Sequence, residues 1–280
     1  MMSARVVTDS ACDLPTSVLE QLGISMVPAD VIHRGHAYKD RVDISHDKLF
    51  SLLEQGSEVP TTAAPSPGSF TEVYNRLAEE TDEIVSLHTT SEHSAIYDAA
   101  LRGSENVTQP CRIQVVDSRQ ISMGLGFLAM DAAEAARDGA SLKEVVQQVR
   151  REIPLIHLYA AFDTMRYLTL GGRVNRLIGT LGTTLNVKLL LTIRDGRLRL
   201  AGVARTFPRA IDRLVSLMEK LGELEEWSVV YTTNREEAET LAQRLSQISP
   251  PGRVPMTRLG PGLGVHGGPG ALITVTKVRA

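Results

Sequence analysis

Short apolar runs alternate with longer amphipathic segments through the first half of the chain. The runs Arg5–Thr8, Glu83–His88 and Ile113–Asp117 have the length and composition of buried strands. After the last of them, apolar residues recur at helical spacing, at Ile121, Leu125, Leu128 and Ala132. Strands that alternate with helices in this way predict a parallel, Rossmann-like sheet with helices on its faces.

Turn and capping residues set the expected ends of several elements. We expect one strand over Ile24–Val31, followed by a hairpin turn around Gly35. Ser66 precedes Pro67, and a capping side chain followed by proline is typical of the first turn of a helix.

The second half carries the pattern of an antiparallel sheet. Asp195-Gly196 lies between the apolar runs Asn186–Ile193 and Arg197–Arg205, which is a strong signal for a hairpin. The fold class is therefore α/β with two domains. We expect residues 1–153 to form a parallel α/β domain, and residues 154–280 to form an α+β domain with a largely antiparallel sheet.

Glycine dominates one segment near the end of the chain. Six of the eleven residues of Gly260–Gly270 are glycine, and His266 is the only titratable side chain among them. We expect a loop whose backbone N–H groups converge on an anion and which forms a wall of a binding site. A tight turn with a hydrogen-bonded His266 is the alternative. The spacing G-x-G-x-x-G also occurs here. However, Pro269 follows at once, where a dinucleotide-binding motif would open a helix.

Two hydroxyl side chains lie near expected helix starts. Thr62 comes shortly before the helix that Pro67 begins, and Ser91 is expected to cap a helix whose first turn contains Ser94. Free N–H groups at helix starts, together with hydroxyls, favour an anion. The alternative is that these hydroxyls only cap their own helices. Asp9 and Asp117 follow strands and are expected to form turns.

Composition excludes several classes of function. A net charge of −3 gives no general attraction to nucleic acid, and an aromatic content of 4% argues against stacking of bases. Cys12 and Cys111 are the two cysteines, which fits a reducing cytoplasm and excludes a zinc site built on cysteines. No secretory signal or run of eighteen apolar residues is present. We expect a cytoplasmic protein without a metal or cofactor.

Four blocks of sequence together resemble the DegV family of bacterial fatty-acid-binding proteins, in the same order along the chain. Thr62–Gly68 resembles the family's Thr-Ser-Gln-Pro-Ser-Pro, and Ser91–Tyr97 resembles its Leu-Ser-Gly-Thr-Tyr. The blocks are Val7–Pro15, Thr62–Gly68, Ser91–Tyr97 with Val116–Gly126, and Gly171–Arg173 with Gly260–Gly270. This chain departs from the family pattern at Ala63, Ala64, Ala95 and Gly267.

The resemblance implies two α/β domains that bury a long-chain fatty acid. Its carboxylate would be held by Thr62, Ser94 and His266. Such a protein presents the fatty acid to a separate ATP-dependent kinase, which makes an acyl-phosphate for phospholipid synthesis, and it can contact a membrane transiently. Arg173 would lie near the exposed ligand end, where the kinase docks. The alternative for Gly171-Gly172-Arg173 is a helix end followed by a solvated arginine and another helix.

Two other functions remain open from the residues alone. A hydrolase or acyltransferase could use Ser94 with His266, because a nucleophile and its base need not be close in sequence. The chain, however, has no G-x-S-x-G motif. An enzyme acting on nucleotides or sugar phosphates is the third reading, and the phosphate-binding motif G-x-x-x-x-G-K-[ST] is absent. The length of the acyl chain depends on packing at the closed end of a pocket, which the sequence does not specify.

Overall fold

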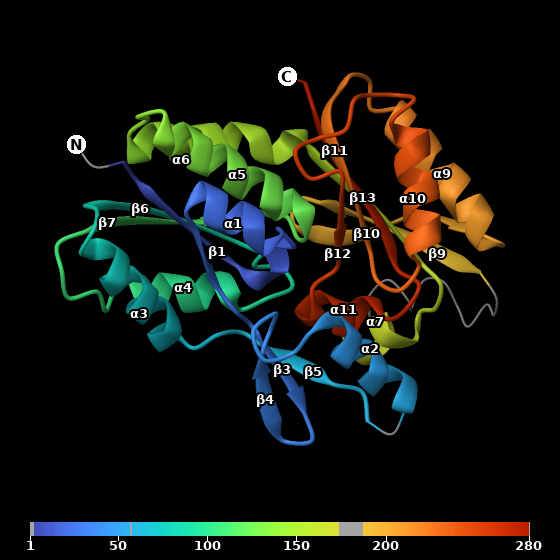
Figure 1. The fold of residues 1–280 in the computed structure, drawn as a ribbon, viewed down its shortest axis with the longest axis horizontal. Coiled ribbons are helices and arrows are strands. Elements are labelled where there is room, and N and C mark those ends of the chain that lie inside the picture. The colour runs from blue at the N-terminus through green and yellow to red at the C-terminus, as the bar shows by residue number, and fades with distance from the viewer. Residues whose placement is uncertain (1–2, 57, 174–186, 280) are drawn as a thin grey trace.

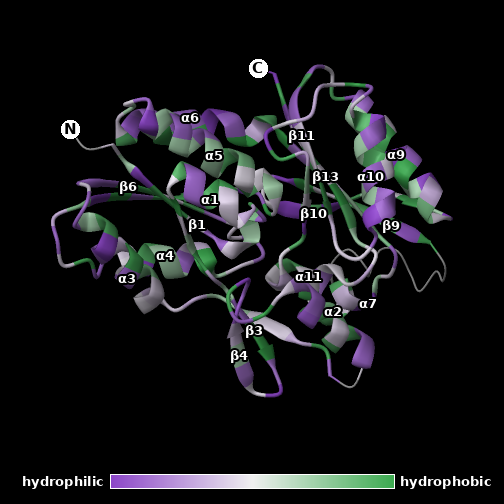
Figure 2. Ribbon diagram, in the orientation of Figure 1, coloured by the Kyte–Doolittle hydropathy of each residue, from purple (hydrophilic) through white to green (hydrophobic). Residues whose placement is uncertain are grey.

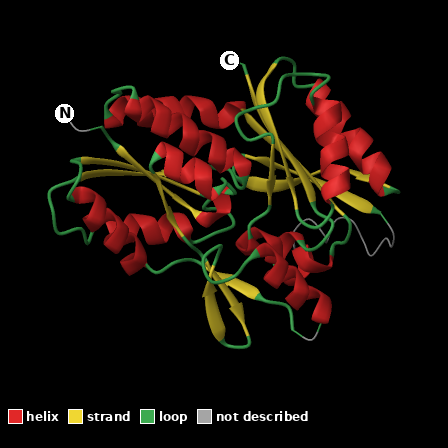
Figure 3. Ribbon diagram, viewed as in Figure 1, coloured by secondary structure: helices red, strands yellow, loops and turns green. Residues whose placement is uncertain are grey.

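The structure is a computed structural model that describes residues 3–56, 58–173 and 187–279. Its described strands form three sheets, two large and one small (Figure 1). Figure 3 shows the small three-stranded sheet set apart from the two large ones, which lie side by side with helices around them. The helix expected directly after Arg173 falls outside the described residues.

The first half builds a parallel sheet, as predicted. Its strand order is β2-β1-β6-β7, and each neighbouring pair is parallel. The strands are β1 (Arg5–Asp9), β2 (Ile24–Val27), β6 (Glu83–His88) and β7 (Arg112–Asp117). The helices of this half are α1 (Thr16–Leu22), α3 (Pro67–Ala78), α4 (Ile96–Ser104), α5 (Met123–Arg137) and α6 (Leu142–Glu152), with a short 3-10 turn η1 (Ser10–Cys12) after β1. Helices α5 and α6 cover one face of the sheet, and α3 and α4 cover the other (Figure 1).

The second half builds a six-stranded sheet of order β10-β9-β8-β13-β11-β12. All neighbouring described strands in it are antiparallel except β11 and β12, which confirms the predicted α+β character. The strands are β8 (Ile156–Phe162), β9 (Lys188–Arg194), β10 (Arg197–Ala204), β11 (Leu224–Tyr231), β12 (Met256–Arg258) and β13 (Leu272–Val278). The helices are α7 (Arg166–Leu170), α9 (Phe207–Glu219), α10 (Arg235–Leu245) and α11 (Pro261–Gly267), and a 3-10 turn η2 (Ile153–Leu155) precedes β8.

The turn between β9 and β10 confirms the hairpin expected at Asp195-Gly196. Both residues have a positive φ, of 51° and 79°, which suits the turn type that joins two antiparallel strands with the least distortion. The two-domain division at residue 153 stays a prediction. The parallel sheet ends before this point in the chain, and the antiparallel sheet begins after it.

One predicted strand is in fact two strands. The sequence predicted a single strand over Ile24–Val31, but β2 ends at Val27, and β3 (Asp30–His33) belongs to the small sheet. Pro28 separates them, because proline has no N–H group to donate to a neighbouring strand. The small sheet has the order β4-β3-β5, with β4 (His36–Lys39) and β5 (Thr61–Ala63), and α2 (His46–Gln55) lies between β4 and β5 in the chain.

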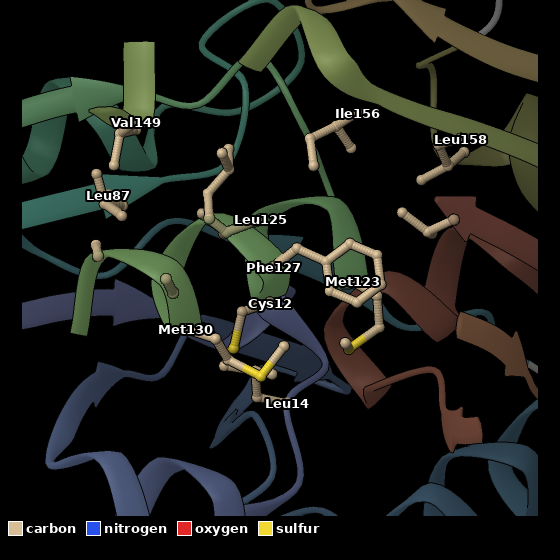
Figure 4. Close-up of a cluster of buried hydrophobic side chains, with 14 of the residues drawn as sticks. Cys12, Leu14, Leu87, Met123, Leu125, Phe127, Met130, Val149, Ile156 and Leu158 are labelled. Atoms are coloured by element: carbon tan, nitrogen blue, oxygen red, sulfur yellow. The ribbon is translucent and has the colours of Figure 1, made fainter. Parts of the chain in front are cut away.

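Helix α5 is the buried layer between the two large sheets. Twelve of its fifteen residues are buried, as expected for a helix that is apolar on all sides. Figure 4 shows Leu125 lying toward Leu87 and Val149, while Met123 and Phe127 lie toward the side of the second sheet. In Figure 2, α5 carries mainly hydrophobic residues, whereas the neighbouring α6 carries many hydrophilic ones. One hydrophobic core therefore joins both halves through this helix.

A cluster of charged side chains ties α5 to the second sheet. Asp131 of α5 accepts hydrogen bonds from Nη2 of Arg253 at 2.6 Å and from Nζ of Lys277 at 2.9 Å. Lys277 also lies 2.9 Å from Glu225, and Arg253 lies 2.8 Å from Glu134. Asp131 and Lys277 are both buried. Removing one member of such a buried pair leaves the other charge poorly compensated.

We expect Asp131→Ala to lower the free energy of unfolding by about 3 kcal/mol, because the buried Lys277 ammonium group loses its partner on α5. Urea unfolding measures the loss. The control is Glu239→Ala, which removes an exposed pair with Arg235 and should cost less than about 1 kcal/mol. Equal, small losses in both variants would show that the cluster does not hold the two halves together.

Candidate functional site

A cavity of about 490 Å³ lies where the small sheet, α11 and the two large sheets meet. Most of its lining is apolar, including Phe162, Leu168, Ile193, Leu198, Leu259 and Ile273. Its polar lining includes Thr62, Ser94, His266, Arg173, His93 and Asp40. All four site residues expected from the sequence therefore border one cavity.

The glycine-rich segment forms a helix, so the prediction of a loop was wrong. Helix α11 spans Pro261–Gly267, and Pro261 occupies its first turn, where a missing N–H group costs nothing. Two of the glycines allow close packing. A Cβ atom at Gly262 would lie 2.6 Å from Oδ2 of Asp40, and one at Gly264 would lie 2.8 Å from Leu49. The G-x-G-x-x-G spacing, at Gly262, Gly264 and Gly267, lies inside this helix rather than ahead of it. The strand before α11, β12, is parallel to β11, whereas the strand after it, β13, is antiparallel to β11, so α11 does not join two parallel strands as in a βαβ unit.

Two N–H groups of this segment bind carboxyl groups of the chain itself. Gly260 donates its N–H to Oδ1 of Asp13 at 2.7 Å, and Gly262 donates to Oδ1 of Asp40 at 3.0 Å. Burial raises the pKa of Asp13 to about 7 and that of Asp40 to about 6. The sequence predicted that these N–H groups converge on one anion, whereas two of them are paired with two separate carboxyl groups of the chain itself. A ligand must be held by other groups.

His266, in the last turn of α11, contacts Thr62 of β5. Nε2 of His266 lies 2.9 Å from Oγ1 of Thr62. Its other ring nitrogen, Nδ1, is buried and has no hydrogen-bond partner among the described residues. A Cβ atom at Gly171 would lie only 2.3 Å from this Nδ1, which explains why glycine stands there. Burial and, to a smaller extent, the charge of Arg173 lower the pKa of His266 to about 4, so the ring is neutral at neutral pH.

Ser94 lies just before helix α4, not in its first turn. The predicted helix start at Ser91 was wrong, because Oγ of Ser91 instead donates to Oδ2 of Asp117 at 2.6 Å. Helix α4 begins at Ile96, and Oγ of Ser94 accepts a hydrogen bond from the Ile96 N–H at 3.2 Å. Asp117 also accepts from the N–H of Arg119 at 2.8 Å, so it is the turn-forming residue that the sequence predicted.

Contacts across the boundary between the two halves hold the segment that carries Ser94. Oγ1 of Thr90 donates to the carbonyl of Gly196 at 2.9 Å. Nε2 of His93 accepts from the N–H of Leu198 at 3.0 Å, and Glu92 accepts two hydrogen bonds from Arg197. The hairpin of β9 and β10 therefore fixes this segment against the cavity.

Arg173 lies at the border of the cavity on an exposed segment. Its Nη1 donates to the carbonyl of Gly171 at 2.5 Å. The guanidinium also lowers the pKa values of His266 and His93, behind the larger effect of burial on each ring. Arg173 therefore supplies positive potential to the same cavity that His266 and Thr62 line.

The geometry does not assemble a hydrolytic triad from Ser94 and His266. Nε2 of His266 faces Thr62, and among the described residues no carboxylate binds its Nδ1. A ring with a pKa of about 4 is also a weak general base at neutral pH. A serine, histidine and aspartate do form a chain elsewhere, because His88 lies 2.7 Å from Ser86 and 3.1 Å from Asp9. All three are fully buried, so no substrate reaches them.

Asp9 has a structural function that matches the expected turn. Its carboxylate accepts hydrogen bonds from the N–H groups of Ala11 and Thr89, two residues that line the cavity. The sequence analysis missed Asp13, Asp40 and His93. Asp13 stands in the Val7–Pro15 block, but nothing local in the sequence connects it with Gly260. Among the described residues, no group of three or more histidine, cysteine or acidic side chains could hold a metal ion.

No helix in the described part of the chain is long and apolar enough to cross a membrane. Comparison with solved structures gives close matches over the whole chain. A DegV family protein from Thermus thermophilus, described with its fatty acid binding, has a TM-score of 0.92 and 29% identity, covering 99% of this chain and 100% of that one. DegV of Bacillus subtilis, a fatty acid binding protein, has a TM-score of 0.91 and 25% identity over 100% of both chains.

Sequence comparisons agree with these structures. A DegV domain-containing protein of Caldanaerobacter subterraneus is 34% identical over 274 residues, which are 97% of each chain. One from Streptomyces coelicolor is 35% identical over 283 residues, covering 98% of each chain. The model of the DegV family, described as uncharacterised, matches residues 3–276. With its two large sheets, its cavity and this match over nearly its whole length, the chain belongs to the DegV family.

Proposed function

We propose that this protein binds one long-chain fatty acid in the cavity and presents it to a separate ATP-dependent kinase in the cytoplasm. The acyl chain occupies the apolar part of the cavity, and Thr62, Ser94 and His266 hold the carboxylate. The kinase then makes an acyl-phosphate for phospholipid synthesis. The protein itself performs no chemistry and needs no cofactor.

The observation that carries this proposal is the state of the two hydroxyl groups. The oxygen of Ser94 already accepts a hydrogen bond from the Ile96 N–H, so the hydroxyl hydrogen remains to be donated. If Nε2 of His266 carries the proton, Oγ1 of Thr62 accepts it in a hydrogen bond, and the Thr62 hydroxyl likewise keeps its own hydrogen to donate. That tautomer leaves only an acceptor unpaired at Nδ1, and buried acceptors are left unpaired more readily than buried N–H groups. A carboxylate accepts hydrogen bonds only, so it matches both hydroxyls.

His266 then acts mainly as a positioning residue for Thr62. A neutral imidazole adds no charge to the site at neutral pH. Arg173, at the cavity border, supplies the nearby positive charge, and a ligand carboxylate would in turn raise the pKa of His266. The site thus combines two hydroxyl donors with a cation at moderate distance.

The size and lining of the cavity favour an acyl chain. A volume of about 490 Å³ falls within the usual range of about 300–1,000 Å³ for small-molecule pockets. Each buried methylene contributes about 0.8 kcal/mol, so roughly fifteen give on the order of 12 kcal/mol before the cost of immobilisation is subtracted. The related structures from Thermus thermophilus and Bacillus subtilis are of fatty-acid-binding proteins, which supports the same ligand class here.

Binding without catalysis is tested on the purified wild-type protein. We expect native mass spectrometry to find one long-chain fatty acid per chain after incubation with palmitate. The same protein should leave p-nitrophenyl esters and acyl-thioesters intact, because His266 is neither basic nor paired with Ser94. Hydrolysis that disappears in both Ser94→Ala and His266→Ala would instead establish a hydrolase.

The two hydroxyls should each contribute to affinity. We expect Thr62→Val and Ser94→Ala to weaken palmitate binding by roughly 1–3 kcal/mol each, because the buried carboxylate loses a donor. Isothermal titration calorimetry measures both variants. The matched controls are Thr61→Val and Ser91→Ala, whose exposed side chains lie outside the cavity lining and should leave affinity unchanged. Wild-type affinity in both Thr62→Val and Ser94→Ala would refute this carboxylate site.

Arg173 should matter more for phosphorylation than for binding. In Arg173→Ala we expect palmitate affinity to fall by less than about tenfold, since the guanidinium acts on the head group only at a distance. Acyl-phosphate formation with a bacterial fatty acid kinase should fall further, because the exposed side chain stands where the head group meets the kinase. Arg166→Ala is the control, as Arg166 is exposed on α7 and outside the cavity lining. Unchanged turnover at limiting binding protein would argue against docking at Arg173.

A further inference from the structure

A second cavity, of about 760 Å³, lies next to the first across the boundary of the two halves. Its wall is partly apolar, with Val116, Ile153 and Ile156, and it also carries Arg150 and Arg194. Ile193 lines both cavities. The adjacent residues Gln120 and Ile121 are divided between them, because Gln120 lines the second cavity and Ile121 lines the first.

Ile193 lies on β9 just beyond the last residue that pairs with β8. The last residue of β9 that pairs with β8 is Thr192, opposite Tyr159, whereas Ile193 pairs with Leu198 of β10 alone. Ile193 is only 5% exposed and packs in the same core cluster as Leu191 and Leu189, the residues two and four positions earlier. Alternate residues of a strand share one face, so Ile193 points from the sheet toward the first half of the molecule.

The core cluster that contains Ile193 includes residues of both cavities. Ile273 and Phe162 line the first cavity, Val116 and Ile156 line the second, and all four share this cluster with Ile193. On the opposite side, the amide of Gln120 donates to the carbonyls of Ile153 and Ile156, at 3.5 Å and 3.4 Å. The Gln120–Ile121 segment is thereby held in place on one side of the division, and the Ile193 side chain lies on the other side.

We infer that Ile193 is the partition that ends the acyl pocket and so sets the length of fatty acid that the protein accepts. This inference rests on the proposed function. The acyl chain lies along the apolar lining of the first cavity, and Ile193 is the described residue that this lining shares with the second cavity. Removing its side chain joins the pocket to the apolar inner wall of the second cavity. Longer acyl chains can then extend into space that the Ile193 side chain closes off in the wild-type protein.

The test compares binding of saturated fatty acids of 12 to 20 carbons by calorimetry in wild-type protein, Ile193→Ala and Ile193→Phe. In Ile193→Ala the optimum should move to longer chains. The affinity ratio of C18 to C16 should rise by about fifteenfold, because C18 has two more methylenes and each newly buried methylene is worth about fourfold in affinity. In Ile193→Phe, the added volume should move the optimum to shorter chains. The control Leu191→Ala shortens a fully buried residue on the same face of β9 that lines neither cavity, and should keep the wild-type profile.

The possible outcomes separate this inference from the proposed function. If wild-type protein binds none of these acids, the proposed function fails. If it binds them, and both Ile193 variants keep the wild-type length profile, the partition is refuted while the proposed function stands. A shift equal to that of Leu191→Ala would also refute it, since general loosening of the core would then be the cause. Thermal unfolding of each variant, with and without palmitate, establishes that a folded protein was measured.

Discussion

The position of helix α11 depends on two buried carboxylates from the other end of the chain. Asp13 and Asp40 accept the N–H groups of Gly260 and Gly262, 247 and 222 residues away in sequence. A helix N-terminus has N–H groups without a partner inside the helix, and these two carboxyl groups accept from N–H groups there. This anchoring places His266, one turn further along, against Thr62. The contact between His266 and Thr62 therefore forms only when the first and last parts of the chain are folded together.

The sequence predicted the helices and strands whose signals are local. Its predictions were wrong for elements whose position depends on contacts between residues far apart in the chain. Strands such as β6 and the turn at Asp195-Gly196 follow from apolar runs and a turn pair, and both were correct. Helix α11 was missed because glycine is a poor helix former, and only its distant partners Asp13 and Asp40 explain why it forms.

The candidate site follows the same division. The residue types Thr62, Ser94, His266 and Arg173 were expected from a resemblance, and the structure brings all four to one cavity. The predicted start of α4 at Ser91 was wrong. The segment before the helix is held by contacts with β10, such as the hydrogen bond between His93 and Leu198. His93 and Leu198 are 105 positions apart, so a helix start that depends on their contact has no local pattern in the sequence.

The titrating groups around α11 respond to acid in opposite directions. Asp13 and Asp40 have pKa values raised by burial, to about 7 and about 6, so their contribution to stability grows as the pH falls through these values. His266 has a pKa lowered by burial from 6.5 to about 4, so its contribution is lost over that range as the pH falls. Between about pH 4 and pH 6.5 these effects oppose each other across one short helix. Acid therefore favours the folded state at the start of α11 and disfavours it at His266, near the end of the same helix.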